Sequence, residues 1–92
     1  MYKIGILKEE KTPPDTRVAL TPSQAFQLML KYEHVLIKAV SSSSRCFNDT
    51  AYIEMGVPVK QDVNDCEILI GVKEVPLENL IPNKTYLFFR TP

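Results

Sequence analysis

Residues 2–7, Tyr-Lys-Ile-Gly-Ile-Leu, decide how the rest of the chain is interpreted. This isoleucine-rich run ends at once in Lys8-Glu9-Glu10-Lys11. A short apolar run bounded by charges predicts a β-strand that is buried on both faces. Strands of this kind belong to parallel sheets covered by other elements, so the run directs the interpretation toward an α/β fold.

A helix start follows at Thr21-Pro22-Ser23-Gln24. Thr21 can cap the helix, Pro22 suits the first turn, and Gln24 stands at the capping-box position. Apolar residues then recur at helical spacing up to Tyr32, and Phe26 and Leu30 widen the apolar stripe. We therefore expect this helix to be covered on more than one side.

Extended and helical segments alternate through the remaining sequence. We expect strands over residues 34–40, 68–72 and 85–89, the last of them buried. Between the first two strands we expect a short helix, with Asn48 as its N-cap and Gly56 as a residue of positive φ after its end. We also expect a short extended piece, which Pro58 confines to an edge or connection, and one helical turn over 62–65. This order predicts an α/β domain with a mostly parallel sheet flanked by helices. It is Rossmann-like without the glycine-rich loop, because the glycines are Gly5, Gly56 and Gly71 alone.

Composition restricts the function classes. The 92 residues suffice for one domain, and 45% hydrophobic and 24% charged residues are typical of a globular chain. Eleven basic and eleven acidic residues leave no net field, which argues against nucleic acid and anionic membranes as partners. No apolar run approaches the ~20 residues of a membrane span, and no secretory signal is visible. We therefore expect a cytoplasmic chain.

The sequence gives little support for a metal site or for a catalytic relay that contains histidine. Cys46 and Cys66 lack a second pair at metal-binding spacing, and we expect free thiols, mostly buried. His34 is the only histidine and has no partner placed for a catalytic relay, so a structural role is favoured. We expect no metal site.

Charged residues follow three of the expected strands, namely Lys8 to Lys11, Lys73-Glu74 and Arg90. If those strands are parallel, their carboxyl ends meet, and the ligand crevice of an open sheet lies there. Arg17 in the long first loop adds a guanidinium, which binds a carboxylate through two parallel hydrogen bonds. The residues suit a small polycarboxylate. The plainer alternative is that these are solvated loop charges which neutralise one another.

Lys73 stands out because it directly follows an apolar strand. A partly buried lysine has a lowered pKa and can serve as general acid or base near neutral pH.

Three segments together resemble the N-terminal domain shared by alanine dehydrogenase, the transhydrogenase alpha subunit and the lysine-forming saccharopine dehydrogenases. They are Lys-Ile-Gly-Ile-Leu-Lys-Glu-Glu-Lys (3–11), Arg-Val-Ala-Leu-Thr-Pro (17–22) and Gly-Val-Lys-Glu-Val-Pro (71–76). Residues 80–89 are most similar to the lysine 2-oxoglutarate reductase and saccharopine dehydrogenase branch. The resemblance covers residues 3 to about 89.

The resemblance implies roles for matching residues. Arg17 would bind a substrate carboxylate, and Lys73 would be an active-site acid/base. Lys11 and Asp15 resemble assisting residues of the saccharopine branch, and Glu74 joins them as a substrate-binding candidate. Full-length family enzymes use NAD or NADP for the oxidative deamination of an amino acid such as saccharopine, or for the reverse reaction. The implied ligand is a small amino acid or 2-oxo acid.

Two departures limit this reading. The family places a catalytic histidine after its Tyr-x-Phe-Phe strand, where this chain has Arg90-Thr91-Pro92, and it carries a separate nucleotide-binding domain. We therefore expect residues 1–92 to form a single, partial N-terminal substrate-binding domain with no cofactor site, inactive alone as a dehydrogenase. A missing partner domain or self-association would cover its exposed surface. The alternatives are a stand-alone, non-catalytic module for carboxylate binding or association, and a degenerate product without ligand.

Overall fold

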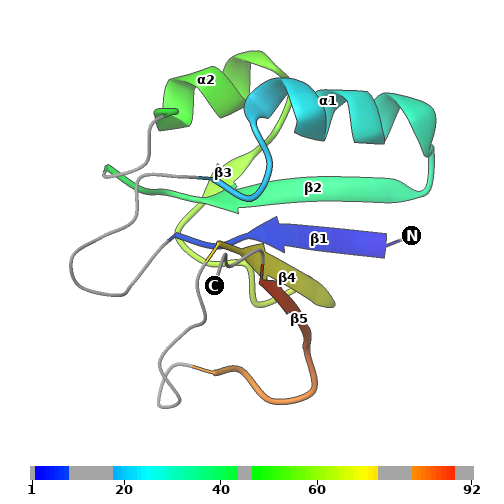
Figure 1. Ribbon diagram of the computed structural model, residues 1–92, viewed down its shortest axis with the longest axis vertical. Helices are drawn as coiled ribbons and strands as arrows, with labels where there is room; N and C mark the ends of the chain where they lie inside the picture. The colour runs from blue at the N-terminus through cyan, green and yellow to red at the C-terminus, as the bar shows by residue number, and fades with distance from the viewer. Residues whose placement is uncertain (1, 9–17, 44–46, 73–79, 89–92) are drawn as a thin grey trace.

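A computed structural model describes residues 2–8, 18–43, 47–72 and 80–88 (Figure 1). Its elements are, in chain order, β1 (Tyr2–Ile6), α1 (Pro22–Lys31), β2 (Val35–Val40), α2 (Asp49–Glu54), β3 (Val59–Lys60), β4 (Ile68–Gly71) and β5 (Thr85–Phe88). The expected α/β fold is confirmed. The strands expected over 2–7, 34–40 and 68–72 each differ from the observed ones by one residue at an end, and the last residue of the strand expected over 85–89 lies outside the described residues.

The sheet has five strands in the order β3-β2-β1-β4-β5, and all four pairings are parallel. From β1 the chain steps outward to β2 and β3, each time through a helix. It then returns past β1 to place β4 and β5 on the other side. The direction of winding therefore reverses between β1 and β4, which is the topological switch point of the sheet.

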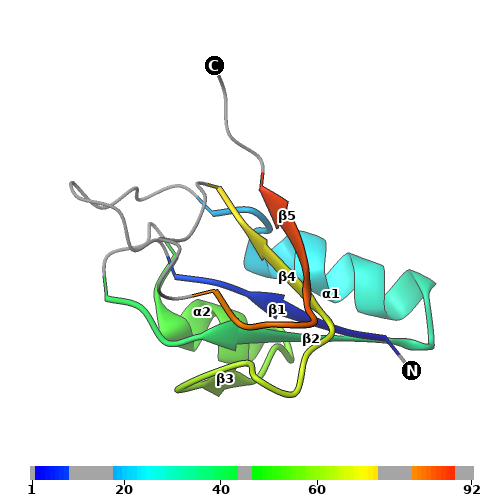
Figure 2. The ribbon, with the colours of Figure 1, turned by 90° about the horizontal axis from the view of Figure 1, so that it is seen from below.

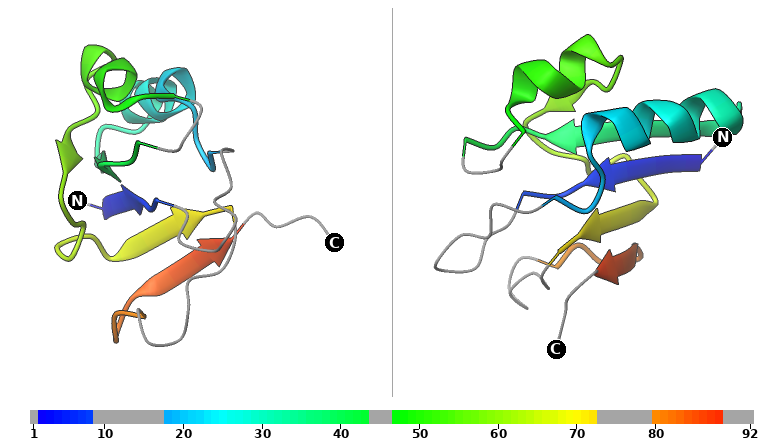
Figure 3. Two further views of the ribbon diagram at one scale, coloured as in Figure 1. Left: turned by 90° about the vertical axis from the view of Figure 1, so that its left-hand side faces the viewer. Right: turned by 45° about the horizontal axis from the view of Figure 1, so that its top comes forward.

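Both described helices lie on one face of the sheet (Figures 1 and 3). Beneath them a row of apolar side chains runs across three strands, because Ala39 pairs with Ile6 and Ile6 pairs with Ile70. Ala25 of α1 and Tyr52 of α2 pack onto this row and are fully buried. This layer is the main core.

The opposite face is covered by residues 61–67, here called the crossing segment, which leads from β3 to β4 beneath β2 and β1 (Figure 2). Val63 and Cys66 of this segment are buried with Val40 and Leu69. Gly5 makes the approach possible, since a Cβ there would stand 2.7 Å from the Cβ of Val63. The expected helical turn over 62–65 is instead a hydrogen-bonded turn, in which Asn64 N–H donates to Asp62 Oδ1 at 3.1 Å.

The predicted helix caps are confirmed. Thr21 Oγ1 accepts from Gln24 N–H at 3.1 Å, while Gln24 Oε1 accepts from Thr21 N–H at 3.0 Å, which completes the capping box. Asn48 Oδ1 accepts from Ala51 N–H at 2.9 Å, and Gly56 has a φ of 80°. The predicted place of Pro58 is also confirmed, because the strand that follows it, β3, lies at the edge of the sheet.

Two burial predictions are wrong. Among the residues that the structure describes, α1 is covered on its sheet-facing side only, and Phe26 and Leu30 are 40% and 73% exposed. β5 is not a buried strand but the second lateral edge of the sheet, with alternating exposed and half-buried residues. Neither described helix extends over β5, so Leu87 is 48% exposed.

Candidate functional site

The carboxyl ends of β1, β4 and β5 lie side by side because these strands are parallel neighbours. The amide of Leu7, just after β1, donates to the carbonyl of Ile70 on β4 at 2.9 Å. The pairing therefore continues up to the switch point. The geometric premise of the predicted site, three strand ends at one end of the sheet, is confirmed.

The predicted site residues themselves are Lys11, Asp15, Arg17, Lys73 and Glu74, and all of them lie outside the described residues, as does Arg90. Their side-chain positions stay predictions. The structure does describe the residues that border the segments 9–17 and 73–79, which contain five of these candidates. Lys8, after β1, is exposed, whereas Val72, directly before Lys73, is 4% exposed. The residue directly before Lys73 is therefore buried beside the switch point.

Val18, which directly follows Arg17, is the first residue after the segment 9–17 that the structure describes. Residues 18–20 are half-buried, and the hydroxyl of Tyr52 donates to the carbonyl of Leu20 at 2.5 Å. Tyr52 is fully buried in α2. This hydrogen bond ties Leu20, which follows Arg17 by three residues and lies just before α1, to the buried Tyr52 of α2.

The carboxyl end of β2 holds a polar cluster that the sequence interpretation missed. Ser41 Oγ donates to Asp49 Oδ2 at 2.5 Å, and Ser42 N–H donates to Asp49 Oδ1 at 3.1 Å. The cluster joins the residues just after β2 to the first turn of α2. The sequence signal for it was serines following a strand, with an aspartate directly after the N-cap Asn48, a combination typical of side-chain capping of turns.

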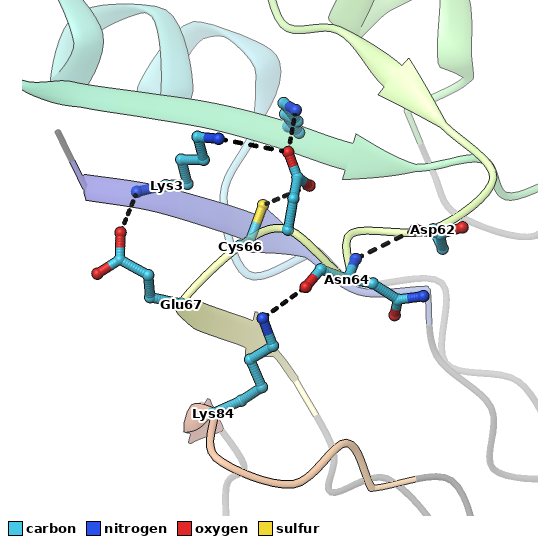
Figure 4. Close-up of polar contacts among 8 residues, drawn as sticks. Lys3, Asp62, Asn64, Cys66, Glu67 and Lys84 are labelled. Carbon is cyan, nitrogen blue, oxygen red and sulfur yellow. Dashed lines mark hydrogen bonds and ion pairs between the residues drawn. The ribbon is translucent and has the colours of Figure 1, made fainter.

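A second polar cluster lies on the face opposite the helices (Figure 4). Asp65 Oδ2 lies 2.6 Å from Lys38 Nζ and 3.6 Å from Lys3 Nζ. The hydrogen bond from Lys38 holds the pKa of Asp65 below its usual value, and the same bond raises the pKa of Lys38. These groups anchor the crossing segment to β1 and β2.

Cys66, beside this cluster, is a free and fully buried cysteine, as predicted. Burial raises the pKa of the Cys66 thiol, and the neighbouring carboxylate of Asp65 adds to the shift. A thiol kept protonated in this way is a poor nucleophile. Cys66 therefore serves packing. Cys46 lies outside the described residues.

An open groove of about 340 Å³ runs along α1, lined by Leu20, Gln24, Gln27, Leu28 and Lys31. Its lining is mainly leucine and glutamine. Lys31 is the one ionisable side chain among these residues and lies at the far end of the helix from Leu20. The groove thus lacks the convergent charged groups that an acid/base or carboxylate site requires.

The part of the chain that the structure describes contains no group of His, Cys, Asp or Glu side chains able to hold a metal ion. Nor is there, in those residues, a helix long and apolar enough to cross a membrane. Residues 6–21, from the end of β1 to α1, contain no glycine, whereas the dinucleotide-binding fingerprint has several glycines between its first strand and first helix.

Comparison with known proteins agrees with this architecture. Residues 5–92 match the family described as alanine dehydrogenase/PNT, N-terminal domain. The chain is 28% identical over 92 residues to the alpha-aminoadipic semialdehyde synthase of Arabidopsis thaliana, an alignment that covers 94% of this chain and 8% of that protein.

Two further proteins are similar to this chain. The mitochondrial alpha-aminoadipic semialdehyde synthase of Bos taurus is 29% identical over 86 residues, covering 94% of this chain and 9% of that protein. An alanine dehydrogenase of Halomonas elongata is 33% identical over 82 residues, covering 85% of this chain and 22% of that protein. The chain thus spans less than a quarter of the length of each relative.

Proposed function

Because the chain belongs to the alanine dehydrogenase/PNT N-terminal domain family, we propose that it is the substrate-binding part of an NAD(P)-dependent amino-acid dehydrogenase, of the lysine-forming saccharopine dehydrogenase or alanine dehydrogenase type. The ligand is a small amino acid or 2-oxo acid with at least one carboxylate. The whole enzyme's reaction is part of this proposal, since the chain spans a small fraction of the relatives.

One observation supports the proposal most strongly. β1 and β4 are parallel neighbours on either side of the switch point. The segment after β1 carries Arg17, and the segment after β4 begins with Lys73. Ligands of open α/β sheets bind at such a point, outside the carboxyl ends of the strands. The two residues of the family motifs therefore belong to the two loops that a bound ligand would contact.

The proposed roles follow from side-chain chemistry. Arg17 binds the substrate carboxylate through its guanidinium fork, with Lys11, Asp15 and Glu74 completing the polar surround. Lys73 moves a proton on or off the substrate amine. The sequence has no glycine-rich loop of the kind that holds a dinucleotide, so we assign no hydride-transfer step to this chain and propose that it is inactive alone as a dehydrogenase.

Calorimetric titration tests the proposal. The chain is titrated with saccharopine, lysine, 2-oxoglutarate and pyruvate, and we expect binding heat with at least one of them. Arg17→Ala should abolish that heat, and Arg17→Lys should weaken it because a lysine keeps the charge but not the fork. Lys31→Ala is the matched control, since Lys31 is an exposed cation at the other end of α1. Equal heats for Arg17→Ala and Lys31→Ala would contradict the proposed site.

A module of the same fold without ligand is the second candidate function. The exposed apolar residues on α1 and β5 favour it, because they offer surface for association. Absence of heat with all four compounds, in a chain that stays folded, would favour association alone. Thermal denaturation with and without NAD completes the test, since a shift with NAD would contradict the absence of a cofactor site.

We also propose that the protein is cytoplasmic, although the Bos taurus relative is named as mitochondrial. The free cysteine Cys66 supports a reducing compartment. Fractionation of cells that express the natural gene, followed by immunodetection, distinguishes cytoplasm from organelles. Recovery in an organelle fraction would contradict this location.

A further inference from the structure

The described lysines differ in whether the fold gives their ammonium group a partner. Four of them lie against a carboxylate, a backbone carbonyl or an aromatic ring, namely Lys3, Lys38, Lys84 and Lys31. Lys8 and Lys60 are exposed, and neither forms an ion pair or a side-chain hydrogen bond with another described residue. These two cations are therefore the ones that packing within the described chain does not explain.

Lys8 lies at the switch point of the sheet, whereas Lys60 lies at a lateral edge. The pairing of β1 with β4 continues up to the Leu7 amide, which donates to the Ile70 carbonyl at 2.9 Å. Lys8 is the next residue along the chain. Lys60 ends β3, which β2 separates from β1. The two lysines thus have the same chemistry and a similar exposure but different places in the fold.

The described surroundings of the switch point are apolar. Val72, after β4, is 4% exposed, and Leu7 is half-buried. Ala19 packs against the core cluster that contains Ile6, the last residue of β1. Among the described residues at this end of β1 and β4, the ionisable side chain is therefore that of Lys8. An ammonium group beside apolar surface attracts an anion more strongly than one surrounded by water, because the local dielectric constant is lower.

We propose that Lys8 determines substrate specificity by binding a second carboxylate of the ligand. This inference rests on the proposed function, in which Arg17 binds the first carboxylate. The lysine ammonium donates charge-assisted hydrogen bonds to a carboxylate. A ligand with one carboxylate leaves Lys8 in water, whereas a ligand with two gains this bond. The favoured substrate class is therefore a dicarboxylate such as 2-oxoglutarate rather than a monocarboxylate such as pyruvate.

The plainer alternative is a solvated lysine with no ligand. Glu9 and Glu10 directly follow Lys8 in the sequence, and their charges would balance it without any bound anion. That alternative predicts that affinity does not depend on a second carboxylate. Ligands that differ in this group alone therefore separate the two explanations.

Calorimetric titration with 2-oxoglutarate and 2-oxopentanoate tests the proposal, since the two compounds have the same carbon chain and differ in the second carboxylate. We expect 2-oxoglutarate to bind at least about tenfold more tightly, the effect of one hydrogen bond to a charged group. Lys8→Gln should remove most of this preference, and Lys8→Arg should retain it because the charge is kept. Lys60→Gln is the matched control and should retain it as well.

Ionic strength gives a second readout. Added salt should reduce the preference for 2-oxoglutarate in the unmodified chain, because it screens exposed charges, and should change it little in Lys8→Gln. Equal dissociation constants for the two compounds, or a preference that Lys8→Gln and Lys60→Gln reduce alike, would overturn this inference and leave the proposed function standing. Absence of heat with both compounds, and with saccharopine and lysine, would overturn the proposed function and this inference with it.

Discussion

The buried hydroxyl of Tyr52 donates a hydrogen bond to the backbone carbonyl of Leu20 at 2.5 Å, although the two residues are 32 positions apart. The bond joins α2 to the turn that precedes α1. Leu20 follows Arg17 by three residues. The buried Tyr52 therefore helps to fix the end of the segment between β1 and α1, the segment that carries the proposed carboxylate-binding residue Arg17.

Tyr52→Phe removes this bond while keeping the ring. We expect the free energy of unfolding to fall by about 1–3 kcal/mol, the range for a buried polar group left without its partner. Thermal and denaturant unfolding measure the loss. Tyr32→Phe is the control, because Tyr32 is 49% exposed. Equal effects of the two substitutions would show that the hydroxyl of Tyr52 adds nothing.

The pair formed by Asp65 and Lys38 should stabilise the fold over a defined pH range. The pKa of Asp65 is lowered by the hydrogen bond from Lys38, so its contribution is present above the ordinary value of 3.8 and is lost as pH falls through the lower folded value. The pKa of Lys38 is raised, so its contribution is present below 10.5 and is lost as pH rises through the higher folded value.

Asp65→Asn should therefore lower the melting temperature by a constant amount between about pH 5 and pH 9. The difference from the unmodified chain should shrink as pH falls from 3.8 through the lower folded pKa of Asp65, where the unmodified carboxyl becomes neutral like the asparagine. Thermal denaturation at a series of pH values measures this. Glu54→Gln, on the exposed end of α2, is the control and should cause little change. A difference that grows toward acid pH would contradict the predicted sign.

Gly5→Ala should destabilise the chain through a collision rather than through backbone strain. The added Cβ would lie 2.7 Å from two atoms of the buried Val63 side chain. Overpacking of this kind costs about 1–3 kcal/mol. The double variant Gly5→Ala/Val63→Ala should recover part of the loss relative to the sum of the single variants. Alanine at position 63 removes Cγ2 and keeps Cβ, so strict additivity in denaturant unfolding would rule out the contact with Val63 Cγ2 as the cause.

Thr21→Ala should weaken the start of α1. It removes the side-chain acceptor of the Gln24 N–H, and caps of this type contribute about 1 kcal/mol. Thr21→Ser should restore most of the stability, because serine presents the same oxygen. Ser23→Ala, an exposed substitution in the first turn, is the control. Guanidinium unfolding of the four proteins ranks them, and a Thr21→Ala curve that overlies the control would refute the cap.

Local signals predicted the elements well. The capping box at Thr21 and Gln24 and the N-cap at Asn48 are short-range patterns whose hydrogen bonds close within one turn, so neighbouring residues suffice to specify them. The strand at residues 2–6 and the place of Pro58 at an edge follow from apolar runs and a missing donor, which are again local.

Burial was predicted less well, because it depends on what lies above a surface. Phe26, Leu30 and Leu87 are apolar and were expected to be covered, yet no described element packs over them. The bond between Ser41 and Asp49 was missed for a related reason. Serines after a strand and an aspartate after an N-cap are typical of side-chain capping, but the pattern does not specify which two residues will meet.

The sequence alone determined the identity of the strands and helices, the family and the candidate residues Arg17 and Lys73, because those depend on residue type and spacing along the chain. Tertiary structure decided the strand order β3-β2-β1-β4-β5 and the course of the crossing segment. Such features arise from contacts between residues far apart in the chain, where Val63 meets Gly5 and Asp65 meets Lys38, and no local pattern encodes them.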